Sequence, residues 1–305
     1  MGLSDLVKPS DWDQESYPDS TDFRVLPFLA VFFFLLRFIL DRFFFERLAA
    51  RLITRQAHHK LDQRRKKIVK FKESAWKFLY TFSAEILALY VTCTEPWFTD
   101  TRHFWLGPED QVWPDLKLKL KLKVMYTFAG GFYVYSFFAL FLWETRRSDF
   151  KVMLAHHITT LLLLVLSYTF RFARIGSVIM AIHDVSDVFL ETAKMSKYSG
   201  AEAIASFCFI IFALSWTGLR LVYFPSWVLW STSYEVISIL DGKKEKKELQ
   251  IYYYVFNTLL YCLLVLHIYW WVLICRMVFR QIRGNGRLTD DVRSDSEGED
   301  HEHED

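Results

Sequence analysis

Long apolar segments recur along this chain, and they constrain its fold more than any other feature. The first segment, residues 25–45, reads VLPFLAVFFFLLRFILDRFFF. At a helical rise of about 1.5 Å per residue it spans roughly 30 Å, which is enough to cross a bilayer. Hydrophobic residues make up 52% of the chain and aromatic residues 18%, a surplus that integral membrane proteins use for lipid-facing and interfacial surface. The sequence therefore predicts an all-α integral membrane protein.

Seven such segments are predicted to span the membrane. They cover about residues 25–45, 76–94, 124–143, 151–170, 175–195, 202–224 and 251–275. Residues 225–250 are expected to connect the last two spans, in part as an interfacial helix. Gly130 and Gly131 in the third segment predict a close approach of two helices. Residues 116–123, LKLKLKLK, alternate strictly, which predicts an exposed strand or an extended interfacial segment.

The distribution of charge predicts the orientation of the chain. The first segment has an acidic flank before it and a basic flank after it, so the positive-inside rule places the N-terminus in the lumen. Seven spans then place the C-terminus in the cytosol, in agreement with the basic residues of 276–287. By the same count the lysines of 116–123 are lumenal, which conflicts with the rule.

These expectations divide the chain into five parts. They are a lumenal N-terminus (1–24), an N-terminal transmembrane helix (25–45), a basic cytosolic linker (46–75), a membrane domain (76–283) and an acidic, disordered cytosolic tail (284–305). The basic residues of 58–73 are interpreted either as a topogenic cluster or as contacts for anionic lipid headgroups. Three tryptophans are expected at a membrane interface: Trp97, Trp105 and Trp113.

Polar and ionisable side chains inside the fourth and fifth segments predict a functional site. They are His156, His157, His183, Asp184, Asp187 and Glu191. Such groups are costly in hydrocarbon unless they face the interior of a helical bundle. In an antiparallel pair of helices, Asp187 lies within about one turn of both His156 and His157. His156 follows Lys151 by five residues and Asp187 precedes Lys194 by seven, so both lie roughly 8–10 Å from the cytosolic ends of their helices.

The residue types of this site favour acid–base or nucleophilic chemistry. Adjacent histidines on one helix point about 100° apart and chelate a single ion poorly, so no metal and no cofactor are expected. A histidine near a carboxylate is suited to accept a proton near neutral pH, and it can equally carry an acyl group covalently. Asp184, Asp187 and Glu191 share one helix face. An ion pair of Glu191 with Lys194 is interpreted with equal weight as helix-to-helix contact or as part of the site.

A basic group directly precedes the histidines. It consists of Arg146, Arg147 and Lys151, at the cytosolic end of the fourth segment. Arginine binds phosphate in a bidentate manner, so one interpretation is a contact with the phosphates of a nucleotide-bearing acyl donor. The other interpretation, of equal weight, is that these residues are ordinary topology signals at a cytosolic helix end.

The run from Arg147 to Lys194 contains R-S-D-F-x-x-M-x-x-H-H-x-x-T, then S-Y, R-x-G-S and H-D-x-S-D-x-x-L-E-x-x-K. This ordered set resembles the Lag1 motif of ceramide synthases, which belong to the TRAM/Lag1/CLN8 membrane family. The resemblance extends over nearly the whole chain. Peptides such as FKESAWKFLYTFSAEILAL and MSKYSGAE are similar to the plant branch in particular.

The resemblance implies N-acylation of a sphingoid base by a fatty acyl-CoA in the endoplasmic reticulum membrane. It also implies a six-helix TLC-type barrel of two inverted three-helix repeats, preceded by one extra span. The double histidine of the family falls on His156 and His157, and its acidic pair falls on Asp184 and Asp187. The residues assigned to substrate binding are Arg146, Arg147, Lys151, His183 and Glu191.

The partners expected from the resemblance are fatty acyl-CoA as a co-substrate, a sphingoid base, membrane lipids, and a second subunit in a homo- or hetero-dimer. No nucleic-acid partner is expected, and similarity to the plant branch suggests very-long-chain acyl donors. Two other classes compete with the enzyme: a non-catalytic lipid-binding or trafficking protein with the same barrel, and a proton-coupled transporter. The paired histidines inside the larger motif favour the enzyme.

Overall fold

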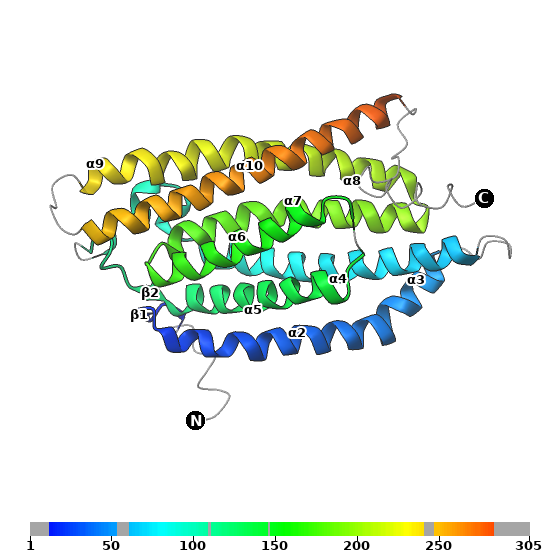
Figure 1. Ribbon diagram of the computed structural model, residues 1–305, viewed down its shortest axis with the longest axis horizontal. Coiled ribbons are helices and arrows are strands. Elements are labelled where there is room, and N and C mark those ends of the chain that lie inside the picture. The colour runs from blue at the N-terminus through cyan, green and yellow to red at the C-terminus, as the bar shows by residue number, and fades with distance from the viewer. Residues whose placement is uncertain (1–11, 54–60, 109–110, 146, 241–246, 284–305) are drawn as a thin grey trace.

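The computed structural model describes residues 12–53, 61–108, 111–145, 147–240 and 247–283, which form an all-helical bundle apart from two short paired strands (Figure 1). The elements are β1 (Glu15–Ser16), η2 (Ser20–Val25), α2 (Leu26–Leu40), η3 (Asp41–Phe45), α3 (Glu46–Leu52), α4 (Leu61–Thr92), η5 (Pro96–Phe98), η6 (Thr101–Phe104), β2 (Leu118–Lys119), α5 (Leu120–Leu142), α6 (Phe150–Thr169), α7 (Ala173–Ser199), α8 (Glu202–Ser215), η7 (Trp216–Leu229), η8 (Ser231–Glu235), α9 (Val236–Leu240) and α10 (Lys247–Arg283). The prediction of an all-α chain is confirmed.

Five helical stretches in the described part of the chain are long and apolar enough to cross a membrane. They are Ser20–Leu52, Leu120–Leu142, Phe150–Thr169, Glu202–Ile239 and Ile251–Arg283. The prediction of a multi-pass membrane protein is thereby confirmed. The helices α4 and α7 are also long, but they lie outside this set because they carry many charged side chains.

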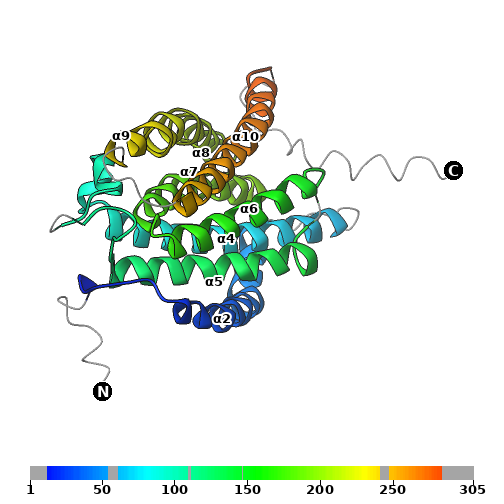
Figure 2. The same ribbon diagram turned by 60° about the vertical axis from the view of Figure 1, so that its left-hand side comes forward.

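Helix α7 lies in the middle of the bundle. In both views α4, α6 and α8 lie around it, and it also contacts α5 and η7 (Figures 1 and 2). None of its 27 residues is exposed. A helix that neighbours cover on all sides does not need a lipid-facing apolar surface, so its polar side chains can face the interior of the bundle. This position explains why the most polar of the predicted spans contains the acidic residues of the site.

The N-terminal helical stretch packs along α5 and turns its other face outward. A Cβ atom on Gly131 would collide with Leu29, and one on Gly130 would lie 2.9 Å from Leu26 Cδ2. The predicted close approach at these glycines is confirmed, and the helix that approaches is α2. The outward face carries exposed side chains, as a lipid-facing surface requires: Phe28, Phe32, Phe34, Leu35, Phe38, Phe43 and Phe44.

Two stretches that were expected as connectors are helical. The basic stretch 46–75 contains α3 and the first part of α4, with residues 54–60 outside the described part. The helix that begins at Glu202 continues through η7, η8 and α9 to Leu240, well into the connector expected at 225–250. Pro225 lies inside η7, where the π-helical hydrogen-bond pattern accommodates a residue that lacks an N–H group.

The alternating segment 116–123 is extended only in its first half. Leu118–Lys119 forms β2, which pairs antiparallel with β1, and α5 begins at Leu120. The lysines of this segment form ion pairs, Lys119 and Lys121 with Asp13 and Glu95, and Lys123 with Asp22. Acids therefore neutralise all three lysines within the protein.

Residues 96–116 contribute to a cap of short helices and turns at the end of the bundle near α9 (Figures 1 and 2). We call Trp97, Trp105, Trp113 and Arg174 the aromatic cap. The three tryptophans are at most 4% exposed, so they are buried inside the protein and are not on its outer surface. Burial is possible because each indole N–H has an acceptor: Ser177 Oγ, Ser231 Oγ and the carbonyl of Phe170, respectively.

Candidate active site

A cavity of about 790 Å³ lies between α4, α5, α6, α7, α8 and α10, and we call it the main cavity. A smaller space of about 70 Å³, the inner chamber, lies beside it and is bounded mainly by α5, α6, α7 and α10. Four residues line both spaces: Tyr133, His156, Asp187 and Arg220. The predicted site therefore lies where the two spaces meet, between helices that are far apart in the sequence.

The paired histidines line the main cavity, and their rings diverge. The ring centroids of His156 and His157 are 5.8 Å apart and the rings are tilted by 60°. The His156 ring forms a T-shaped pair with Trp270, with centroids 5.3 Å apart, whereas the His157 ring forms one with Tyr133, with centroids 6.4 Å apart. The Nδ1 atoms of both histidines are buried and have no hydrogen-bond partner among the described residues. Of the two, only His156 also reaches the inner chamber.

The two aspartates differ in their partners. Asp187 Oδ2 is 2.9 Å from Arg220 Nη2, and no hydrogen bond joins Asp187 to either histidine within the described residues. In this structure the partner of Asp187 is therefore Arg220 and not a histidine. Asp184 lines the main cavity and forms neither a hydrogen bond nor an ion pair within the described part of the chain. The free carboxylate of the pair is thus Asp184.

Arg220 is a site residue that sequence reasoning missed. Its side chain is 4% exposed, its Nη2 atom donates to the carbonyl of His183 at 2.6 Å, and its guanidinium stacks 3.9 Å from the centre of the Trp216 ring. It belongs to η7, within the π-helical stretch that also accommodates Pro225. The available signal was a single arginine in the otherwise apolar sixth span, since a charge at such a position marks a functional or paired group.

A second histidine pair lies beside the inner chamber, which one of its members, His183, lines. His183 Nδ1 is 2.6 Å from the carbonyl of Ile179, which can only accept, so Nδ1 carries the proton. His183 Nε2 then accepts from His267 Nε2 at 2.8 Å. His267 is fully buried and was not predicted as a site residue, although it is a lone histidine in the last apolar span. Both ring nitrogens of His183 thus have protein partners, and the residue lines the inner chamber; its contact with substrate stays a prediction.

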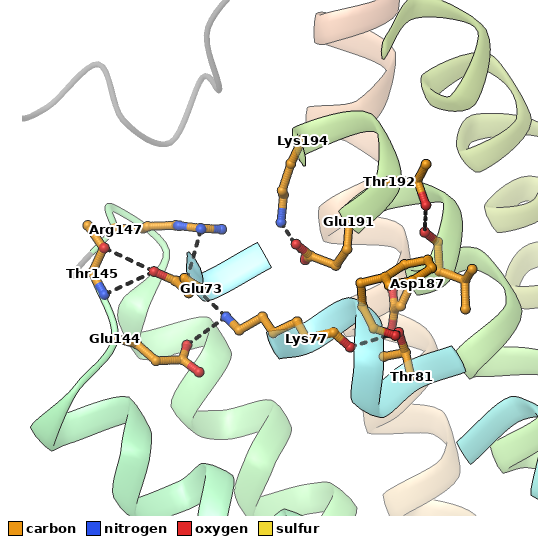
Figure 3. Close-up of polar contacts among 12 residues, drawn as sticks. Glu73, Lys77, Thr81, Glu144, Thr145, Arg147, Asp187, Glu191, Thr192 and Lys194 are labelled. Atoms are coloured by element: carbon orange, nitrogen blue, oxygen red, sulfur yellow. Dashed lines mark hydrogen bonds and ion pairs between the residues drawn. The ribbon is translucent and has the colours of Figure 1, made fainter. Parts of the chain in front are cut away.

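Glu191 and Lys194 form an ion pair at 2.7 Å on the wall of the main cavity (Figure 3). Both residues belong to α7, four and seven residues after Asp187. The two interpretations of this pair are therefore compatible, because it neutralises a charge on α7 and also lines the cavity.

The basic group before the histidines is arranged differently from the prediction. Arg146 lies outside the described residues, and Lys151 is exposed and does not line either space. Arg147 Nη2 is 3.1 Å from Glu73 Oε1, as Figure 3 shows. Lys77 lies between Glu73 at 3.0 Å and Glu144 at 2.8 Å. This network ties the segment before α6 to α4 and gives Arg147 a carboxylate partner; neither of its two interpretations, phosphate contact or topology signal, is tested by this contact.

The arrangement suits proton transfer or nucleophilic attack in a space shielded from water. The side chain of His156, which has no described hydrogen-bond partner, lines a cavity large enough for a lipid chain, and the free carboxylate of Asp184 lines the same cavity. The Asp187–Arg220 pair holds the wall between the two spaces. Within the described residues, no group of three or more His, Cys, Asp or Glu side chains is placed to hold a metal ion.

Comparison with known proteins agrees with this arrangement. Residues 70–276 match the model of the TRAM/LAG1/CLN8 family, which is described as the TLC domain. The Arabidopsis thaliana proteins named ceramide synthase 1 LOH3 and ceramide synthase LOH1 are 63% and 58% identical to this chain over the full length of both partners. The Homo sapiens protein named ceramide synthase 4 is 34% identical over 76% of this chain and 55% of its own length. The chain belongs to the TLC-domain family and, within it, to the Lag1-type plant ceramide synthases.

Proposed function

We propose that the protein is a ceramide synthase, an acyltransferase that moves a fatty acyl group from acyl-CoA to the amine of a sphingoid base. The observation that carries the proposal is the position of His156, which lines both the main cavity and the inner chamber and has no hydrogen-bond partner among the described residues. Relatives named ceramide synthase that align over the full length support the same reaction.

In this reaction the amine nitrogen attacks the thioester carbonyl, the carbon–sulfur bond breaks, and an amide bond forms. The amine loses one proton and the departing thiolate gains one, so a single base can serve both steps. His156 is that base in the proposal, because its side chain lines both spaces and has no described hydrogen-bond partner. Asp184 binds the ammonium group of the sphingoid base, since it is the carboxylate without a described partner of its own. Asp184 also takes the proton that this ammonium must lose before its nitrogen can attack, and releases it to solvent.

A covalent route fits the same geometry. His156 then attacks the thioester first, CoA leaves as the thiol, and the amine takes the acyl group from the imidazole. Intact-mass measurement of the purified protein after acyl-CoA alone separates the two routes. An adduct of acyl mass indicates the covalent route, and the absence of any adduct under turnover conditions indicates direct attack.

The proposal includes an arrangement in the membrane. The five apolar stretches together with α4 and α7 make seven spans, of which the last six form a TLC-type barrel of two inverted three-helix repeats. The N-terminus faces the lumen of the endoplasmic reticulum and the C-terminus faces the cytosol. Support for this orientation comes from the basic first part of α4, which carries unpaired lysines, whereas the lysines before α5 are neutralised. Very-long-chain donors and assembly with a second subunit are further parts of the proposal, on the resemblance to the plant branch.

The test is product formation by the purified full-length protein in liposomes with mixed acyl-CoAs and sphinganine. We expect mass spectrometry to detect N-acylated base with the wild type, and a loss of about 10²–10⁴-fold with His156→Ala. His103→Ala is a matched control, because His103 belongs to η6 and lines neither space. A wild type that forms no amide, or a His156→Ala variant with unchanged turnover, contradicts the proposal and favours a non-catalytic lipid-binding protein.

A further inference from the structure

Three lysines of α4 line the outer part of the main cavity, and the reaction described above does not use them. They are Lys66, Lys67 and Lys70. None of them forms a hydrogen bond or an ion pair with any residue that the structure describes. Lys77, further along the same helix, is held between Glu73 and Glu144. On this wall of the cavity, carboxylates therefore neutralise the lysine near the histidines. The three lysines towards the mouth have no described carboxylate partner and are available to a ligand.

The same helix sets the distance between these lysines and the reacting centre. Lys66 and Lys70 are four residues apart and lie on one face of α4. At a rise of about 1.5 Å per residue, they lie roughly 10–16 Å along the axis from Lys77. Lys77 and His157 line the same cavity, together with Glu144. A group bound by the lysines would thus be separated from the histidines by about the length of an extended pantetheine arm.

The neighbouring cation cannot take over this role. Arg147 also lines the cavity, but its guanidinium is committed to Glu73, which also accepts from Thr145 Oγ1 at 3.0 Å. A phosphate that captured Arg147 would remove one of the two cations that neutralise the buried Glu73, which is costly. Phosphate binding by Lys66, Lys67 and Lys70 has no such cost, because it separates none of them from a described carboxylate.

We propose that Lys66, Lys67 and Lys70 bind the phosphates of the acyl donor and thereby place its thioester at His156. This inference rests on the proposed function, since it names the part of the acyl-CoA that the outer cavity recognises. Lysine binds phosphate as a point charge on a flexible stem, which suits several phosphate groups in one open mouth. Anionic lipid headgroups present the same chemistry, so the experiment must distinguish the two sources of phosphate.

The experiment compares donors with and without phosphates. Purified full-length protein in nanodiscs of neutral phosphatidylcholine is assayed with acyl-CoA and with the matching acyl-pantetheine, which lacks every phosphate. For the wild type we expect a KM for acyl-CoA at least about tenfold lower than for acyl-pantetheine. The variant Lys66→Gln/Lys67→Gln/Lys70→Gln should raise the KM for acyl-CoA by about tenfold and leave that for acyl-pantetheine within about twofold. Added salt should raise the KM for acyl-CoA in the wild type more than in the variant.

Lys72→Gln is the matched control. Lys72 belongs to the same helix, but its ammonium lies 3.8 Å from Glu46 and it does not line the cavity, so both KM values should stay unchanged. Equal effects of the triple variant on the two donors, or no effect on either, overturn the inference. So does a defect that appears only in nanodiscs with anionic lipid, because that result assigns the lysines to headgroups. If the wild type forms no amide from any donor, the proposed function itself is wrong, which is a separate outcome.

Discussion

The aromatic cap and the walls of the main cavity both bury polar atoms, but they satisfy them differently. In the cap, three indole N–H groups have protein acceptors and Arg174 donates to two backbone carbonyls at 2.9 Å. On the cavity walls, the Nδ1 atoms of His156 and His157 and the carboxylate of Asp184 have no described partner. Polar groups that are paired within the protein stabilise its packing, whereas unpaired groups that face a cavity are available to a ligand.

Replacement of Asp184 should produce the largest effect on the cavity side of this comparison. Asp184→Asn keeps the size of the side chain and removes its charge, so the ammonium of the sphingoid base loses its counter-ion. We expect kcat/KM for the base to fall by about 10²–10⁴-fold with little change in melting temperature. Steady-state assays with varied base, together with thermal melting in detergent, measure both quantities. An unchanged kcat/KM would show that Asp184 is not the carboxylate that receives the amine.

The cap should respond in the opposite way. Trp105→Ala removes an indole that is 1% exposed and its hydrogen bond to Ser231, so it should lower the free energy of unfolding by about 3–5 kcal/mol. Activity per folded molecule should remain near that of the wild type. Trp230→Ala is the control, because Trp230 is 49% exposed, and it should leave the melting temperature nearly unchanged. Loss of turnover in a fully folded Trp105→Ala protein would break the distinction between cap and cavity.

The two buried arginines, Arg220 and Arg174, show what pairing with a carboxylate adds to otherwise similar contacts. Arg220 and Arg174 both stack on a tryptophan and donate to backbone carbonyls, but only Arg220 also pairs with a carboxylate of the site. We expect Arg220→Met to lower kcat/KM by about 10–100-fold, because Asp187 loses the group that positions it. Arg174→Met should lower the melting temperature without this loss of turnover per folded molecule.

A double-mutant cycle tests whether Arg220 acts through Asp187. If it does, Arg220→Met should have little further effect on kcat/KM in an Asp187→Asn background. Additive effects of the two substitutions would instead assign Arg220 an independent contact with substrate. Arg220→Lys should restore part of the activity, since it keeps the charge although it loses the planar geometry.

The smallest effect is expected at the border between the two regions. A Cβ atom on Gly176 would collide with Tyr126 Oη, which hydrogen-bonds Ser167 at 3.0 Å and lines the inner chamber. Gly176→Ala should therefore shift Tyr126 and cost about 1–3 kcal/mol of stability, with a change in turnover of only a few-fold. Gly218→Ala is the control, because a Cβ atom there meets nothing within 4 Å. Equal melting temperatures for the two variants would contradict the close packing of Tyr126 on α7.

Most of the helical content and the main residues of the site were predictable from local patterns. Apolar length predicted most of the spans, and the spacing of His156, Asp184 and Asp187 predicted that they meet in one site. The ends of elements were less predictable, because the π-helical stretch around Pro225 and the helical start of α4 depend on neighbouring helices. The burial of the cap tryptophans was also out of reach, since their acceptors come from other parts of the chain.

The sequence by itself determined an all-helical membrane protein with paired histidines and an acidic pair inside the bundle, because hydrophobic length and helical periodicity are local properties. The tertiary structure decided which of these groups have partners. Arg220 pairs with Asp187 and His267 pairs with His183 across 33 and 84 residues of sequence, respectively, and these pairs leave His156 and Asp184 free. A pairing of this kind depends on which helices pack together, and no periodicity within one segment encodes it.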